Sequence, residues 1–187
     1  MKSLKNLADR PAAAPLVADD ILEFHAGRLL LLLSTCGGTG GSINGLTKMA
    51  KLDFFVRYPD FFSAALAQGL RRKEVRTEAV EAAMIRHHYG PWDKRYYHVL
   101  AYLEARKLIT IVMSGRTRRI ALTALGKVTA RKLLGNEAFH ELVAHMRNVN
   151  EALGRKNGNE LKMMIYDLFG EEVADQPLGR VIGGVQK

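Results

Sequence analysis

The chain has 187 residues, of which 48% are hydrophobic and 25% are charged. This composition is typical of a globular protein and excludes a chain that is disordered throughout, and the length fits one domain or one domain with an appended subdomain. Its 28 lysines and arginines against 19 acidic residues give a net charge of +9. That excess favours a polyanionic partner, most often nucleic acid, although acidic proteins and lipid surfaces also attract basic chains.

The charge is concentrated in one third of the sequence. Between Gly69 and Lys132 the chain has fifteen lysines and arginines and five acidic residues, a net charge of +10. The remaining thirteen basic and fourteen acidic residues give −1. We therefore expect the function to depend on this central segment.

The sequence predicts a cytoplasmic protein that does not contact a membrane. Residues 1–17 are rich in alanine and proline, which indicates a flexible leader, and they contain no apolar stretch of the kind found in signal peptides. The longest purely apolar run, 29–33, is five residues, whereas a bilayer span needs about 20. A single cysteine, Cys36, excludes an internal disulfide and fits a reducing compartment.

The first helix is expected from Ile21 through the leucine run 29–33, with Asp19 and Asp20 at its N-terminus. A helix this apolar belongs in the centre of a core. The glycine-rich segment 37–42 follows, and we interpret it as a flexible hinge. It is not a Walker A loop, because no lysine follows the glycines and a helix, not a strand, precedes it.

Three further helices are predicted before position 92. The first covers 43–58, and Pro59 begins the second, in which Phe61, Phe62, Ala65 and Leu66 share a face. Arg71, Arg72 and Lys73 follow as a loop, and they are either a DNA backbone contact or a solvated linker. The third helix covers 78–88 and is ended by the pair Gly90-Pro91.

The centre of the basic segment predicts a helix followed by a β-hairpin. The helix covers 94–107 behind Asp93, with Tyr96, Val99, Leu100 and Leu103 inward and with Lys94, Arg95 and His98 on its outer face. Strands are expected over 108–113 and 119–122, joined by a turn at Ser114-Gly115. The hairpin tip has three cations, Arg116, Arg118 and Arg119. They either contact phosphate or form a solvated tip that prevents edge pairing.

The remainder of the chain is predicted to be helical. Thr123 caps a helix over 124–134, Asn136 caps another that ends at Leu153, and a last amphipathic helix covers 160–169. The apolar face of the last helix either completes the fold or binds a partner or a second copy. We select it as a partner interface, formed by Leu161, Met164, Ile165, Leu168 and Phe169.

The sequence lacks a recognisable catalytic, metal or cofactor motif. His140 and His145 are five residues apart, so they diverge on a helix and cannot share a zinc ion. Adjacent His87 and His88 point apart in the same way. The aromatic group Tyr89, Trp92, Tyr96, Tyr97 and Tyr102 fits helix packing better than base stacking. We therefore expect a protein that is not an enzyme and binds no metal or cofactor.

The order helix, basic hairpin, helix is typical of a winged helix-turn-helix, in which one helix enters the major groove and the hairpin, or wing, reaches the DNA backbone. Residues 93–132, with the sequence Leu122-Thr-Ala-Leu-Gly126 after the second strand, resemble the PadR/MarR-type winged helix. The segment 54–92 is longer than the usual link before the reading helix. The expected fold is mainly α: a winged-helix domain over 18–134 with an inserted helical segment 54–92, a C-terminal helical extension 135–172 and a tail 173–187.

A second resemblance concerns the biological role. Residues 46–59, 86–93 and 115–117 resemble the middle components of three-component antiphage systems of the Lamassu type, which are encoded beside SMC-like ABC ATPases. The resemblance implies a non-catalytic subunit of an antiviral defence complex that docks on the ATPase, with an effector subunit as a further partner, and that offers a basic surface to double-stranded DNA. The alternative is a homodimeric PadR/MarR-like transcription regulator.

Overall fold

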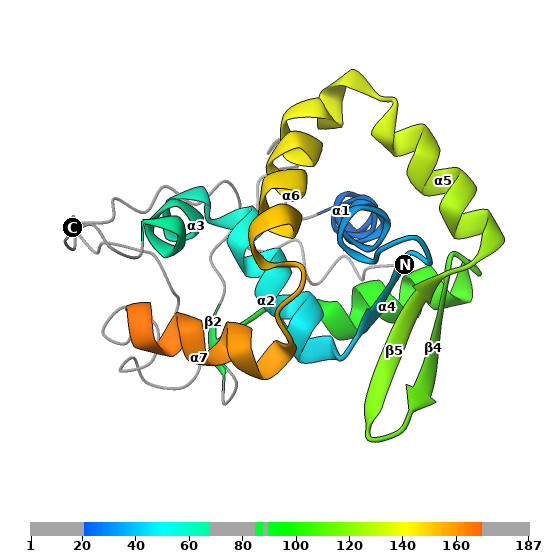
Figure 1. The fold of residues 1–187 in the computed structure, drawn as a ribbon. Helices are drawn as coiled ribbons and strands as arrows, with labels where there is room; N and C mark the ends of the chain where they lie inside the picture. Colours follow the sequence, from blue (N-terminus) through cyan, green and yellow to red (C-terminus); the bar gives the residue numbers. More distant parts are fainter. Residues whose placement is uncertain (1–20, 68–84, 88–89, 170–187) are drawn as a thin grey trace, which may run out of the picture.

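The structure, a computed structural model, describes residues 21–67, 85–87 and 90–169. Figure 1 shows a helical molecule from which one β-hairpin projects. Its helices are α1 (Leu22–Cys36), α2 (Leu46–Arg57), α3 (Pro59–Leu66), α4 (Tyr96–Ala105), α5 (Ala124–Leu134), α6 (His140–Leu153) and α7 (Gly158–Phe169). Its strands are β1 (Ser42–Asn44), β2 (Ile85–His87), β3 (Gly90–Trp92), β4 (Ile109–Ser114) and β5 (Thr117–Leu122). The expected leader and the C-terminal tail lie outside the described residues.

The centre of the molecule is α1. Five consecutive leucines, 29–33, are at most 2% exposed, so this part of the helix is covered on every side. It packs against α4, α5 and α6, and the strands β1 and β5 also contact it (Figure 1). The prediction of a central helix is confirmed.

The main sheet has three antiparallel strands in the order β1-β5-β4. Ile120 of β5 pairs with Ile43 on one side and with Ile111 on the other. The sequence predicts β4 and β5, but it places 43–45 in a helix, and this is wrong: Ser42–Asn44 is a strand paired with β5. A three-residue strand is stabilised by its partner, not by its own sequence pattern.

The glycine-rich segment forms a closed turn between α1 and β1. Gly41 has φ +62°, and a Cβ on it would lie 2.9 Å from Leu122 Cδ1. Ser42 N donates to Gly37 O at 2.9 Å, and Leu122 N donates to Gly41 O at 2.9 Å. The expected hinge is therefore packed against β5, and the missing side chain of Gly41 allows this close approach.

The described part of the segment 54–92 contributes to the core. Aromatic residues of α2 and α3 pack together at an angle, with Phe54 5.1 Å from Phe61 and Phe55 6.4 Å from Phe62 between ring centroids. The helix expected over 78–88 is wrong at its end, because 85–87 forms β2 and pairs with β3. The rest of that expected helix lies outside the described residues.

The C-terminal helices belong to the same core as α1. Thr123 caps α5 as expected, because its side chain accepts from Gly126 N at 3.0 Å. Asn136 accepts from Ala138 N at 3.0 Å and caps a short 3-10 helix, Glu137–Phe139, that runs directly into α6. The inner face of α6 buries Val143, Met146, Val149 and Leu153. Helix α7 packs against α2. Lys48 Nζ of α2 also donates to the O of Gly154, at the end of α6, at 2.7 Å. One continuous apolar cluster therefore extends from Ala26 to Phe169.

Candidate nucleic-acid interface

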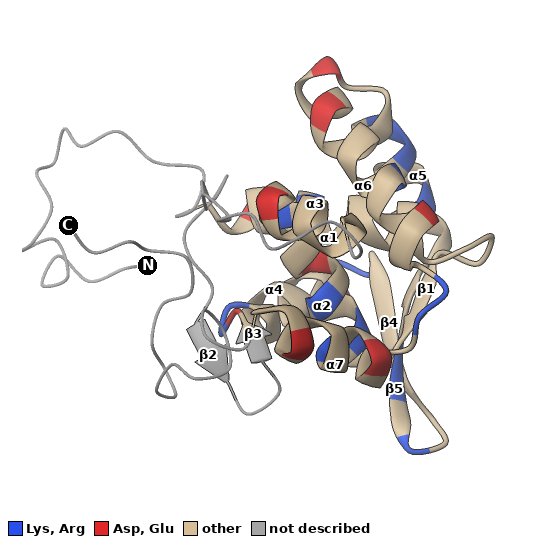
Figure 2. Cartoon of the chain, turned by 60° about the vertical axis from the view of Figure 1, so that its left-hand side comes forward, with Lys and Arg blue, Asp and Glu red and all other residues tan. Residues whose placement is uncertain are grey.

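The β4–β5 hairpin projects from the molecule and has three exposed arginines. Its turn is Gly115-Arg116 between the paired residues Ser114 and Thr117, and Gly115 has φ +60°. Glycine at the first central position of a two-residue turn is the type II′ pattern, which fits the natural twist of a hairpin. Figure 2 shows the basic residues along β5 and at the turn.

The register places the arginines on different sides of the hairpin. Adjacent residues of a strand point to opposite faces. Arg119 therefore shares the outer face with Val112, its partner on β4, whereas Arg118 shares the other face with Met113. Arg116 lies in the turn itself. The three cations therefore lie at the turn and on both faces of the hairpin.

Arg119 also links the hairpin to the rest of the sheet. Its Nη2 donates to Ser42 Oγ at 3.3 Å, and Asn44 is its backbone partner on β1. A guanidinium has five N–H donors, so this bond leaves others for a ligand. The hairpin is thereby oriented by β1 as well as by its own ladder.

Helix α4 buries the face that the sequence predicts. Tyr96, Val99, Leu100 and Leu103 are at most 5% exposed. Lys94 and His98 lie on the exposed side. Tyr97 is 57% exposed on the same side. It is therefore a candidate contact, although the sequence predicts helix packing for this side chain.

The sequence predicts Arg95 on the outer face of the helix, and this prediction is wrong. Its Nε and Nη2 donate to the carboxylate of Asp93 at 2.9 and 2.7 Å. Its Nη1 lies 2.9 Å from His25 Nε2. Since its polar atoms are engaged within the protein, we leave Arg95 out of the candidate interface. Arg71, Arg72 and Lys73 lie outside the described residues.

Behind α4 lies a buried charged network that the sequence reading missed. Asp53 of α2 accepts from Arg28 Nε of α1 at 2.9 Å and from Tyr96 OH of α4 at 2.7 Å. Arg28 and Asp53 are at most 1% exposed. A buried ion pair requires such complete hydrogen bonding to be tolerated. The network fastens α4 to α1 and α2.

Asp93 forms the second half of the network, directly before α4. Its Oδ2 accepts from Arg57 Nη1 at 2.8 Å, and its Oδ1 accepts from the backbone N of Arg95 at 2.9 Å. Burial alone would raise the pKa of Asp93, but the hydrogen bonds from Arg95 and the charges of Arg57 and Arg95 outweigh burial and lower this pKa to about 2. The carboxylate is thus charged at neutral pH and fixes where α4 begins.

His25 connects the two halves. Its Nδ1 lies 3.0 Å from Arg28 Nη1, and its Nε2 lies 2.9 Å from Arg95 Nη1. A guanidinium only donates, so the tautomer of the ring decides which of these two contacts is a hydrogen bond. Burial and the charge of Asp53 raise the pKa of Tyr96 well above its usual value, so its hydroxyl remains a donor.

Two further buried groups are titratable. Burial raises the pKa of the Cys36 thiol to about 12, and its Sγ lies 3.8 Å from Met146 O. On α2, burial and the charge of Lys162 lower the pKa of Lys51 to about 7. Within the described residues no group of His, Cys, Asp or Glu side chains is arranged to hold a metal ion.

The proposed partner face on α7 is wrong for three of its five residues. Leu161, Ile165 and Phe169 are at most 3% exposed because they pack inward, and Phe169 lies 4.6 Å from Phe61 between ring centroids. Met164 and Leu168 are half-buried against the same cluster. The amphipathic pattern is real, but it completes the fold.

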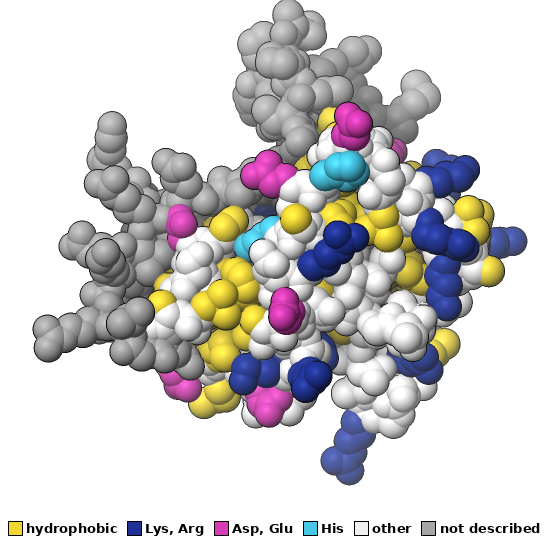
Figure 3. Space-filling view, turned by 45° about the horizontal axis from the view of Figure 1, so that its top comes forward, with side chains coloured by type: hydrophobic (Ala, Val, Ile, Leu, Met, Phe, Trp, Pro, Cys, Tyr) yellow, Lys and Arg dark blue, Asp and Glu magenta, His cyan; other side chains and the backbone are white. Residues whose placement is uncertain are grey.

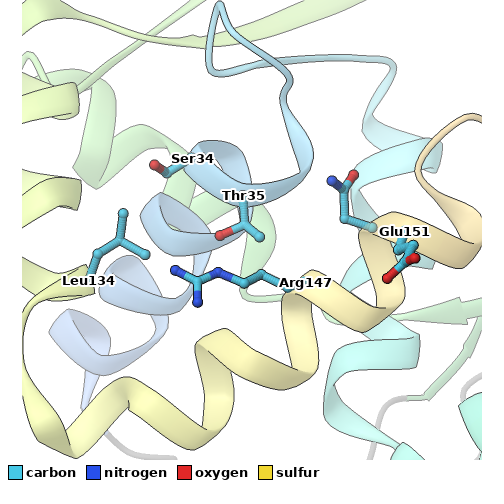
Figure 4. A pocket seen from close by; sticks show the side chains of 6 residues that line it. Ser34, Thr35, Leu134, Arg147 and Glu151 are labelled. Atoms are coloured by element: carbon cyan, nitrogen blue, oxygen red, sulfur yellow. The ribbon is translucent and has the colours of Figure 1, made fainter.

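A hollow of about 280 Å³ lies between the ends of α1 and α5 and the side of α6. It is lined by Ser34, Thr35, Leu134, Arg147, Asn150 and Glu151. Figure 4 shows the guanidinium of Arg147 extending between Thr35 and Leu134, whereas Glu151 lies further along α6. Arg147 and Glu151 are both exposed, so the hollow is a polar surface feature and does not resemble an enclosed active site.

Comparisons with family models, curated proteins and solved structures gave no match to this chain. Among the helices of residues 21–67 and 90–169, none combines the length and apolar composition that crossing a bilayer requires.

Proposed function

We propose that the chain is a non-catalytic winged-helix protein that binds double-stranded DNA through the β4–β5 hairpin and the exposed side of α4. The sheet order β1-β5-β4, with α1 and α2 before α4 and the hairpin after it, supports this fold. Helix α3 is a departure from the simplest arrangement of that fold.

The observation that carries the DNA-binding proposal is the charge of the hairpin. Residues 109–122 contain three cations and no acidic residue, and Arg116, Arg118 and Arg119 are all exposed. Exposed cations gain little from surface ion pairs but release condensed counterions when they meet phosphate. Lys94 and His98 extend the surface along α4, and Tyr97 lies between them.

The test is duplex binding as a function of salt concentration. We expect the variant R116A/R118A/R119A to bind a duplex of about 30 base pairs more weakly, with a slope of log affinity against log salt reduced by up to about three units. The matched control is R147A/R155A/K156A, which removes the same charge from α6 and the loop after it. Equal effects of the two variants would show that net charge, not the hairpin, governs binding.

We further propose that this DNA contact serves an antiphage complex with an SMC-like ABC ATPase. The support is the resemblance over 46–59, 86–93 and 115–117, together with the small, acid-free hairpin, which offers few contacts for tight binding by one copy. Light scattering tests the proposal. It is measured on the chain alone and on the chain co-expressed with an SMC-like ATPase encoded beside its gene. A monomer that joins the ATPase is expected, whereas a symmetric dimer that binds a palindrome tightly would favour the transcription regulator.

A further inference from the structure

We propose that the solvent-facing side of α5 docks an acidic amphipathic helix of a partner protein, an inference that rests on the proposed role as a subunit of a complex. Since the apolar face of α7 is buried inside the fold, a partner would have to bind another surface. Helix α5 packs on α1 and follows β5 directly, which leaves its opposite side to solvent (Figure 1).

The exposed side of α5 has two large apolar side chains among its polar residues. Gly126 and Ala130 face the core and are buried. Leu125 and Val128 are 53% and 43% exposed. Positions three residues apart lie side by side on a helix. Burying two such side chains against a partner is favourable, because they are now half in water.

Cations surround these two side chains. Lys127, Arg131 and Lys132 are exposed on α5, and the stretch 109–134 contains six basic residues and no acidic one. Figure 3 shows lysines and arginines gathered with apolar side chains along the side of the molecule where α5 lies. An apolar pair bordered by positive charge is complementary to apolar residues bordered by carboxylates.

Charge also decides between the possible occupants. A second copy would place the same three cations of α5 against themselves, and like charges across an interface are costly. Duplex DNA would satisfy the cations but would leave Leu125 and Val128 without apolar contact. An acidic helix with leucine-like residues every three or four positions satisfies both kinds of group, in the way that helices bind grooves and faces of partners.

The probe is a synthetic peptide of about 18 residues, or five helical turns, with leucines at three- and four-residue spacing and glutamates elsewhere. A reference peptide has the same composition with the leucines distributed around the helix. Fluorescence anisotropy at physiological ionic strength measures binding to the full chain. We expect the amphipathic peptide to bind and the reference peptide to bind at least about tenfold more weakly.

Three variants locate the site. We expect L125S/V128S to weaken peptide binding about tenfold, the factor that 1.4 kcal/mol produces, and to leave duplex binding unchanged. M163S removes a comparably exposed side chain on α7, 47% exposed, and should leave both affinities within about twofold, since it touches neither surface. K127E/R131E should lose the glutamate peptide and bind a lysine version instead.

The proposal is overturned if the two glutamate peptides bind equally, or if L125S/V128S binds the amphipathic one as the unchanged chain does. Loss of duplex binding in L125S/V128S would assign this side of α5 to DNA. A dimer that the same variant dissociates would assign it to a second copy. Failure of the R116A/R118A/R119A experiment would instead reject DNA binding by the hairpin and leave the peptide result intact.

Discussion

Arg28 lies in a helix whose neighbouring positions are almost all apolar, and it is 1% exposed. It is tolerated there because both Nε and Nη2 donate to Asp53, at 2.9 and 3.2 Å. Removing one partner of such a pair leaves a buried charge and typically costs about 3–5 kcal/mol. The same reasoning applies to Asp93, which two arginines share.

Asp93 makes the stability of the protein depend on acid. Its pKa is about 2 in the folded chain, below the ordinary value of about 3.9. The unfolded chain therefore binds the proton first, and the contribution of Asp93 to stability is complete above about pH 4 and lost as the pH falls toward 2. Allowing for solvent screening, we expect this contribution to be about 1–2 kcal/mol.

Urea unfolding of D93N at several pH values between 2 and 7 measures this contribution. We expect D93N to be less stable at pH 7, by at least the contribution above, because Arg57 and Arg95 lose their shared acceptor. Its stability should fall less steeply than that of the unchanged chain between pH 4 and 2. D167N, which alters an exposed carboxylate on α7, is the control, and an equal effect of both substitutions would contradict the assignment.

At the scale of elements, the junction of the hairpin and α5 depends on a close contact. A Cβ on Gly126 would clash with the carbonyl oxygen of Leu108. That oxygen also accepts from Thr123 N at 3.0 Å. The first turn of α5 is thus seated on the residue before β4, and this contact sets the angle between helix and hairpin.

G126A should therefore destabilise the protein by about 2 kcal/mol or more, since a backbone atom must move to admit the methyl group. Thermal unfolding followed by circular dichroism measures the effect. G27A is the matched control, because a Cβ there would lie 3.8 Å from Leu133 Cδ1. Alanine also favours a helix by up to about 1 kcal/mol over glycine, so we expect G27A to be neutral or stabilising. A G126A protein as stable as G27A would contradict the contact.

Elements with local signals are the ones that the sequence predicts. The leucine run of α1, the caps Thr123 and Asn136, and the period-two pattern of β4 each depend on neighbours in the chain. The strand β1 and the Asp53 pairs depend on residues 25 or more positions away, so no local pattern reveals them. The one available signal was Arg28 itself, since a cation beside a buried leucine run requires a carboxylate partner.

The residues of the candidate interface also differ in how well the sequence predicts them. The arginines of the hairpin tip are exposed because the hairpin projects beyond the core, with Arg116 in the turn and Arg118 and Arg119 on the strand that follows it. Arg95 follows the helical spacing of an outward residue, yet its side chain turns back to Asp93. The face of α7 has the right periodicity for docking, and periodicity alone cannot say whether a helix buries that face in its own chain or in another.

At the scale of the whole molecule, the single apolar cluster implies one cooperative unit. Trp92 is the only tryptophan of the chain and packs 5.4 Å from Tyr96 between ring centroids. It reports on the start of α4, whereas circular dichroism reports on all helices. If α6 and α7 formed a separate unit, the two signals would respond differently to a change in α7.

We expect I165A to lower the free energy of unfolding by about 2–5 kcal/mol, the usual range for a large-to-alanine change in a core. The transitions followed by Trp92 fluorescence and by circular dichroism should shift together. M163A, at an exposed position of the same helix, should change stability by less than about 0.5 kcal/mol. A fluorescence transition that does not move in I165A would show that α7 unfolds independently.

The burial of Cys36 has a practical consequence. Its thiol is 7% exposed, and a pKa raised to about 12 leaves almost no thiolate, the reactive form, at neutral pH. A cysteine introduced in place of Arg116 or Val128 would thus be the one thiol that reacts readily with a maleimide dye. The hairpin and α5 can therefore each be labelled at a single position without first removing the native cysteine.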